Sequence, residues 1–162
     1  MSEQKKYEFT GKIKTIFGIE FKQIRAIISF GCVVAGEIGG WIECEENLSQ
    51  SGDAWVSGNA RVSGNARVYG NAEVYGNARV SGNAEVENNN DYMVVGGAGR
   101  YDRLTTFFKC RDKTIKVICG CFFGTIIEFR AKVKETHKGN KHEKVYLAMA
   151  DMVELQLDDD DK

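Results

Sequence analysis

Six consecutive segments of this chain, which together span residues 54–89, repeat one pattern every six residues. The segments read AWVSGN, ARVSGN, ARVYGN, AEVYGN, ARVSGN and AEVENN, and the last one departs from the pattern after its valine. A period this short and strict differs from the 3.6-residue period of a helix and from ordinary globular patterning. It is typical of stacked β rungs, in which each repeat supplies one short strand and one corner.

The residue types within one repeat agree with this interpretation. Alanine and valine stand two residues apart, so both side chains point to the same side of an extended segment. The glycine and asparagine that follow suit a corner, where the backbone turns tightly. Three repeats make a coil of 18 residues, which places residue i against residue i+18 of the next coil. The register extends backward to a degenerate coil over residues 36–53, so about three coils are expected.

This run of alanine, valine, glycine and asparagine resembles the repeats of the hexapeptide-repeat, left-handed β-helix superfamily. The resemblance covers about a third of the chain. It implies a short left-handed parallel β-helix whose copies associate side by side into a homo-oligomer, with a trimer favoured. The superfamily includes acyltransferases, carbonic-anhydrase-like proteins and binding proteins, so membership does not decide the function.

The segments on either side of the repeat predict further elements. Residues 12–30 alternate apolar and polar side chains imperfectly around a turn at Phe17-Gly18, which predicts a β-hairpin. Such a hairpin would cap the first coil, because an open end leaves strand edges unpaired. Beyond the repeat, three strands and two capped helices are expected at residues 92–95, 104–110 and 114–119, and after Thr125 and Asn140.

The expected fold class is therefore mainly β. It consists of a short left-handed parallel β-helix of about three coils, capped by an N-terminal β-hairpin and followed by a C-terminal ββαα unit. The corresponding parts are residues 1–31, 32–90 and 91–157. Residues 158–162 read Asp-Asp-Asp-Asp-Lys, which is either a native acidic tail or a remnant of protein engineering.

A second resemblance is to small phage and prophage proteins that pair Gly-Asn-Ala-x-Val coils with a particular C-terminal segment. The matching residues are Cys-Gly-Cys-Phe at 119–122, Gly-Thr at 124–125 and Glu-Phe at 128–129, with Gly-Glu-Ile-Gly-Gly-Trp-Ile-Glu at 36–43 as a further point of similarity. The resemblance implies an origin in a virus or mobile element. We therefore expect a location in the cytoplasm of a bacterial host.

Composition and charge narrow the classes of function. The 22 basic and 23 acidic residues give a net charge of −1, which argues against a general nucleic-acid-binding protein. No apolar run approaches the length of a membrane span. The five cysteines are odd in number and irregular in spacing, which indicates reduced thiols and no disulfide framework. Cys119-x-Cys121 lacks the usual zinc-ligand spacing, so no metal is expected.

An enzyme is not expected. The resemblance to hexapeptide acyltransferases would imply a histidine base in a loop of the coils, beside a coenzyme A groove. This chain has two histidines, His137 and His142, and both fall in the predicted helices. Two histidines also cannot supply the three-histidine zinc site of carbonic-anhydrase relatives. We therefore expect no catalytic residue and no cofactor.

Two places in the sequence are candidate anion-binding sites. The 18-residue spacing puts Arg61 beside Arg79, and like charges one rung apart are unfavourable unless an anion or solvent screens them. The alternative is a solvated face on which both guanidinium groups point outward. The second place is the glycine loop at 96–99 with Arg100 and Tyr101, whose amides and guanidinium group would hold an anion. The alternative there is a linker.

Trp55, Tyr69 and Tyr75 occupy outward positions of the repeat and are candidate interface anchors. Together with the arginines they favour a non-enzymatic phage-type binding protein. One hypothesis is sequestration of an anionic nucleotide signal of a host defence system, with phosphates on the arginines and a base on an aromatic ring. The alternatives are a protein-binding inhibitor of a host factor and a structural or oligomerisation module. An acyltransferase is the least favoured.

Overall fold

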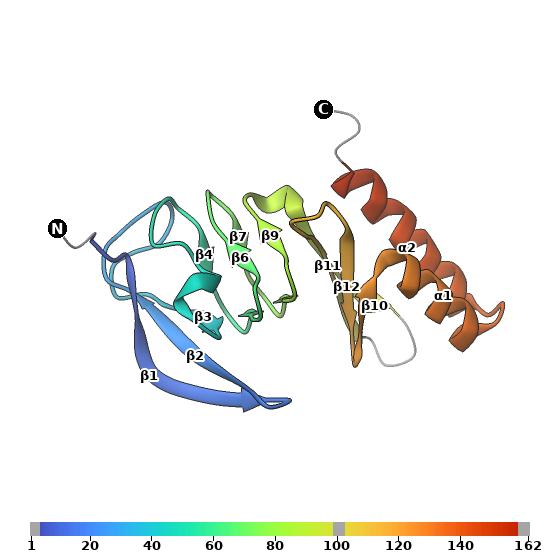
Figure 1. Cartoon of the computed structure of the whole chain (residues 1–162), viewed down its shortest axis with the longest axis horizontal. Helices are drawn as coiled ribbons and strands as arrows, with labels where there is room; N and C mark the ends of the chain where they lie inside the picture. Colours follow the sequence, from blue (N-terminus) through green and yellow to red (C-terminus); the bar gives the residue numbers. More distant parts are fainter. Residues whose placement is uncertain (1–3, 99–102, 159–162) are drawn as a thin grey trace. The chain divides into compact units, whose positions relative to one another are not determined.

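The computed structural model describes residues 4–98 and 103–158. The chain divides into two compact units, Met1–Asn89 and Asn90–Lys162, both visible in Figure 1. Within the described ranges, neither helix has the length and apolar character that crossing a membrane requires.

The first unit begins with a β-hairpin. Strands β1 (Tyr7–Ile16) and β2 (Ile19–Ala26) pair antiparallel, and Ile16 stands opposite Ile19. The two residues between them, Phe17 and Gly18, both have positive φ angles, which suits a tight hairpin turn. The turn is therefore where the sequence predicts it.

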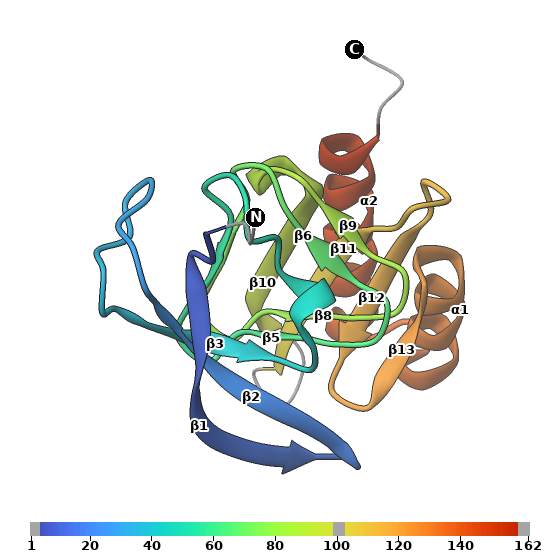
Figure 2. The same ribbon diagram turned by 60° about the vertical axis from the view of Figure 1, so that its left-hand side comes forward.

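The hairpin continues into a mixed five-stranded sheet with the order β1-β2-β3-β5-β8 (Figure 2). Strand β2 pairs antiparallel with β3, whereas β3, β5 and β8 run parallel to one another. The bounds of these three strands are Ile38–Ile42, Arg61–Val62 and Arg79–Val80. The sheet thus joins the hairpin directly to the repeat region.

The other repeats form two two-stranded parallel sheets. Strand β4 pairs with β7, and β6 pairs with β9. A short 3-10 helix, Glu45–Asn47, precedes them in the chain. The strand bounds are Trp55–Val56, Glu73–Val74, Arg67–Val68 and Glu85–Val86.

The predicted 18-residue register is confirmed for three pairs of repeats: Trp55 lies opposite Glu73, Arg61 opposite Arg79 and Arg67 opposite Glu85. The repeat alanines and valines are all buried, and each is at most 1% exposed. At the corners, glycine is required. At Gly64, for example, φ is +63° and an added Cβ would lie 3.2 Å from the backbone nitrogen of Gly82.

The second unit is an antiparallel four-stranded sheet packed against two helices. Its strand order is β10-β11-β12-β13, and α1 and α2 contact the sheet on one side (Figure 1). Phe107, Val117, Phe129 and Val153 belong to the core between these layers. The bounds are Tyr92–Ala98, Arg103–Lys109, Ile115–Cys119, Phe122–Thr125, Ile126–His137 and Lys141–Leu157, and a 3-10 helix, Asn89–Asp91, precedes β10.

The fold class expected from the sequence is wrong for this chain. The described residues form one mixed five-stranded sheet, one antiparallel four-stranded sheet, two two-stranded sheets and two helices. The N-terminal hairpin is part of the first sheet, because β2 pairs edge to edge with β3. The C-terminal unit has four strands before its helices: β10, β11 and β12 lie where strands are expected, and β13 adds an unpredicted fourth at the edge of the sheet.

Candidate functional site

Arg61 and Arg79 lie side by side on the five-stranded sheet. Strands β5 and β8 pair in parallel, and the two arginines are directly opposite each other. Their neighbours Val62 and Val80 are buried, so alternation along each strand directs the arginine side chains outward, where both are half-buried. The like-charged pair inferred from the repeat is therefore present on the outer face of the sheet.

The same face carries two aromatic rings and a further cation. Trp41 of β3 stands opposite Arg61 on one side and opposite Gln23 of β2 on the other. The Lys14 ammonium lies 4.0 Å from the centroid of the Trp41 ring. The Arg61 guanidinium lies 5.7 Å from the ring centroid of Phe21, which is only 4% exposed. We call Lys14, Phe21, Trp41, Arg61 and Arg79 the cationic face.

The charges of the cationic face affect one another. Partial burial lowers the pKa of Arg61, and the positive charge of Arg79 lowers it further. Burial also lowers the pKa of Lys14, with a second contribution from the charge of Arg61. Both shifts mean that the charged forms are disfavoured there, and an anion placed among the three cations would reverse that effect.

Glu43 lies two residues beyond Trp41, close to the end of β3. One oxygen of its carboxylate accepts a hydrogen bond from the backbone N–H of Gly64 at 2.6 Å. Its backbone carbonyl accepts a hydrogen bond from the Lys22 ammonium at 2.9 Å. These two contacts hold the end of β3 at the edge of the cationic face. Through the first of them, the Glu43 carboxylate is hydrogen-bonded to the backbone.

Lys14, Phe21 and Trp41 are not among the candidate residues expected from the sequence. The Phe17-Gly18 turn is a usable signal for the first two, because it fixes the hairpin register that pairs Lys14 with Phe21. No sequence signal indicates that β2 pairs with β3, and this pairing is what brings Trp41 to the same face.

Trp55 is not a surface residue. It is 4% exposed, and its ring packs edge-on against Tyr7 at 6.4 Å and against Phe30 at 5.4 Å. Its indole nitrogen has no hydrogen-bond partner. The N-terminal strand and the loop before β3 therefore cover a position that alternation alone assigns to the outside.

The two predicted tyrosine anchors differ in exposure. Tyr75 is 62% exposed, whereas Tyr69 is half-buried and lines an open groove of about 610 Å³. Glu45 and Glu85 line the same groove, together with Arg67. This mixture of charges makes the groove less suited to an anion than the cationic face.

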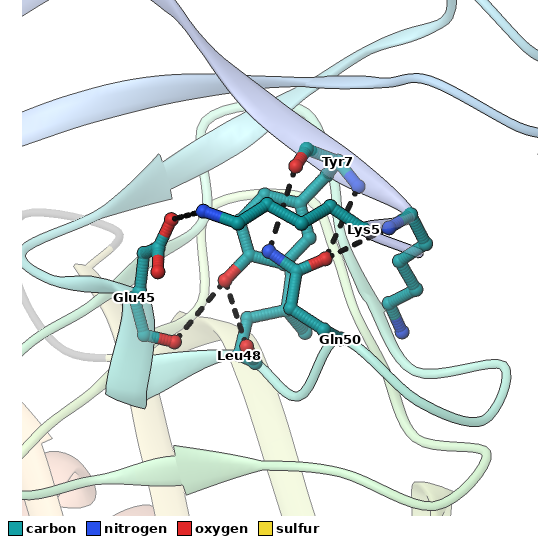
Figure 3. Close-up of polar contacts among 6 residues, drawn as sticks. Lys5, Tyr7, Glu45, Leu48 and Gln50 are labelled. Atoms are coloured by element: carbon teal, nitrogen blue, oxygen red, sulfur yellow. Dashed lines mark hydrogen bonds and ion pairs between the residues drawn. The ribbon is translucent and has the colours of Figure 1, made fainter. Parts of the chain in front are cut away.

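Glu45, Leu48 and Gln50, which line the groove, make polar contacts with the N-terminal segment, drawn in Figure 3. The Tyr7 hydroxyl donates to the backbone carbonyl of Leu48 at 2.7 Å, and the Lys5 ammonium pairs with the Glu45 carboxylate at 2.8 Å. The side-chain oxygen of Gln50 accepts from the backbone N–H of Tyr7 at 3.3 Å. Burial, followed by the negative charge of Glu45, raises the pKa of Tyr7 well above its ordinary value.

Lys6 is buried beneath this strand. Its ammonium donates to the carbonyls of Ala54 at 2.6 Å and Gly52 at 3.3 Å, and lies 4.7 Å from the Phe30 ring centroid. Burial lowers its pKa to about 8, against an opposing contribution from the Asp53 carboxylate. In the neighbouring rungs, the corresponding carbonyls of Ala72 and Ala78 accept backbone N–H groups. Lys6 thus serves as the hydrogen-bond donor to the Ala54 carbonyl, at the start of the first repeat.

The second predicted anion site falls largely outside the described residues. Arg100 and Tyr101 belong to residues 99–102, for which the structure gives no placement. Gly96 belongs to β10, which continues to Ala98, so the first part of the expected loop is strand.

His137 and His142 are located in α1 and α2, with their ring centroids 5.6 Å apart. Within residues 4–98 and 103–158, no group of three histidine, cysteine or acidic side chains is placed to hold a metal ion.

No protein-family model matches this chain, and a search of the curated proteins finds no match.

Proposed function

We propose that this chain is a non-enzymatic binding protein that holds an anionic nucleotide on the cationic face. Its role would be to sequester a nucleotide signal of a host defence system in the bacterial cytoplasm. The observation that carries the proposal is the joint placement of Lys14, Arg61 and Arg79 with Trp41 on one face of one sheet. The resemblance of the sequence to small phage proteins favours the sequestering role.

The chemistry of the face matches both halves of a nucleotide. A phosphate between Lys14, Arg61 and Arg79 gains charge-assisted hydrogen bonds, each worth about 1.5–3 kcal/mol. It also opposes the two causes that lower the pKa of Arg61 and Lys14, which are first burial and then the repulsion between neighbouring cations. The base would contact the indole of Trp41, and such stacking contributes about 1–3 kcal/mol.

The proposal favours a small nucleotide over a long nucleic acid. The face carries three cations, whereas the whole chain has a net charge of −1. A polymer needs many such contacts along its length, which a chain with no net positive charge does not favour, and its binding would fall steeply with salt. A mononucleotide or cyclic nucleotide requires only the local cluster.

Isothermal titration calorimetry tests the proposal. The titrants are a cyclic mononucleotide, a cyclic dinucleotide and a nucleoside triphosphate, with the matching nucleoside and inorganic phosphate as partial ligands. We expect saturable binding of at least one nucleotide, and weaker binding of both partial ligands. Arg61→Gln should weaken the affinity about tenfold, the effect of losing about 1.4 kcal/mol of binding energy.

Arg25→Gln is the matched control. Arg25 is an exposed arginine of the same sheet, and its guanidinium group pairs with the Glu8 carboxylate. This variant should bind the nucleotide as the parent chain does. Equal losses in Arg25→Gln and Arg61→Gln, or no heat with any nucleotide, would remove the proposal.

A further inference from the structure

A second cavity lies wholly within the C-terminal unit, and none of the residues that line it belongs to the cationic face. It has a volume of about 490 Å³ and is formed by the β12–β13 turn and the two helices that follow it. Small-molecule pockets commonly have volumes of about 300–1,000 Å³. The cavity is therefore large enough for one small ligand.

Aromatic rings form its walls. Phe129 of α1 packs against Phe122 at 5.7 Å and edge-on against Tyr146 of α2 at 5.8 Å. Phe129 and Tyr146 are only 3% and 5% exposed. Because both rings belong to the core of the unit, they are held in place before any ligand arrives.

The polar groups at this cavity are cationic or neutral. Lys132 and His137, five residues apart on α1, both line it, and His137 stacks on Tyr146 with ring centroids 5.5 Å apart. No carboxylate is among the described residues that line the cavity. Glu135 reaches Lys132 only at 4.0 Å, and both side chains are exposed, so this ion pair is weak.

We propose that this cavity binds a small aromatic acid, that is, a flat ring system that carries a single carboxylate or sulfonate. The ring inserts against Phe122, Phe129 and Tyr146, where offset and edge-on aromatic contacts are available. The anion lies at the mouth of the cavity and pairs with Lys132. The apolar walls favour this class over phosphates, whose two charges would lose more hydration than one lysine returns.

A cysteine in the cavity wall supplies a direct reporter. Cys121 lines the cavity and its side chain is exposed, whereas Cys32, also exposed, belongs to the N-terminal unit. The two thiols can be alkylated in one sample and told apart by peptide mass. A ligand in the cavity shields Cys121 and leaves Cys32 unaffected.

The experiment uses 1-anilinonaphthalene-8-sulfonate, an aromatic anion, and N-phenyl-1-naphthylamine, its neutral analogue, with the full-length chain. We expect a saturable rise in sulfonate fluorescence and, at 90% occupancy, a slowing of iodoacetamide modification at Cys121 of about tenfold, because only the free tenth of the sites reacts. Cys32 should react at an unchanged rate.

Lys132→Met should weaken the sulfonate about five- to tenfold, as expected for the loss of one charge pair, and should leave the neutral analogue unaffected. Lys134→Met is the matched control, because Lys134 is exposed on the same helix and does not line the cavity. Fluorescence that rises without saturation, equal shielding of Cys121 and Cys32, or equal effects of the two lysine variants would overturn the proposal.

Discussion

Substitution of Lys6 by methionine should change how the stability of the N-terminal unit depends on pH. Lys6 is 2% exposed, and burial lowers the pKa of its ammonium to about 8, compared with 10.5 for an unperturbed lysine. Between these two values the unfolded chain holds a proton that the folded chain has released. The free energy of unfolding therefore rises with pH across this window.

The size of the effect follows from the shift. A difference of about 2.5 pKa units corresponds to about 3 kcal/mol, at 1.36 kcal/mol per unit. The free energy of unfolding of the parent chain should rise by this amount between pH 7 and pH 10.5, and that of Lys6→Met should not. At pH 7 the substitution removes a hydrogen bond of 2.6 Å to Ala54 but also a buried charge, so its net effect there should be small.

The assay is urea unfolding followed by tryptophan fluorescence at half-unit intervals between pH 7 and pH 10.5. The quantity of interest is the difference between the parent chain and Lys6→Met, in which contributions common to both, such as the raised pKa of Tyr7, cancel. Lys5→Met is the control, because Lys5 is exposed and pairs with Glu45 at the surface. A flat difference curve for Lys6→Met would refute the assignment of Lys6 as a buried, desolvated donor.

Three further substitutions test the packing of the chain, each read as a change in urea midpoint. Gly40→Ala should cost about 1–3 kcal/mol, because an added Cβ would lie 2.9 Å from the carbonyl oxygen of Ala60. Asn47→Ala should cost about 2–4 kcal/mol, because its buried amide donates to Ala66 at 2.9 Å and its oxygen accepts two backbone N–H groups. Thr125→Ala should cost about 1 kcal/mol through loss of the α1 N-cap, and a midpoint unchanged within error would contradict any of the three.

The repeat region could be predicted where local rules decide the outcome. The 18-residue spacing is enough to predict that Arg61 pairs with Arg79, because each repeat has the same length and the same type of corner. The turn at Phe17 and the helix start at Thr125 are likewise set by a few adjacent residues. In each case, the information lies within one repeat or one turn.

The positions of Trp41 and Trp55 could not be predicted, because they depend on contacts between segments far apart in the sequence. Gly39 and Gly40 lie in β3 at a place where a larger residue would not fit, since a Cβ at Gly39 would lie 2.6 Å from the Trp55 ring. The pairing of β3 with β2, which no local pattern indicates, then carries Trp41 to the cationic face. Trp55 is buried although the repeat predicts an outward position, because Tyr7 and Phe30, which lie outside the repeat, cover it.

The most direct test of the nucleotide proposal is the intrinsic fluorescence of the chain during a nucleotide titration. The chain has two tryptophans, and Trp55 is buried whereas Trp41 lies on the cationic face. We predict saturable quenching that disappears in Trp41→Phe. The nucleotide affinity obtained from the titration should fall with added salt and should be about tenfold weaker in Arg61→Gln. Quenching that persists in Trp41→Phe, or unchanged fluorescence with every nucleotide tested, would contradict the assignment of the cationic face as the binding site.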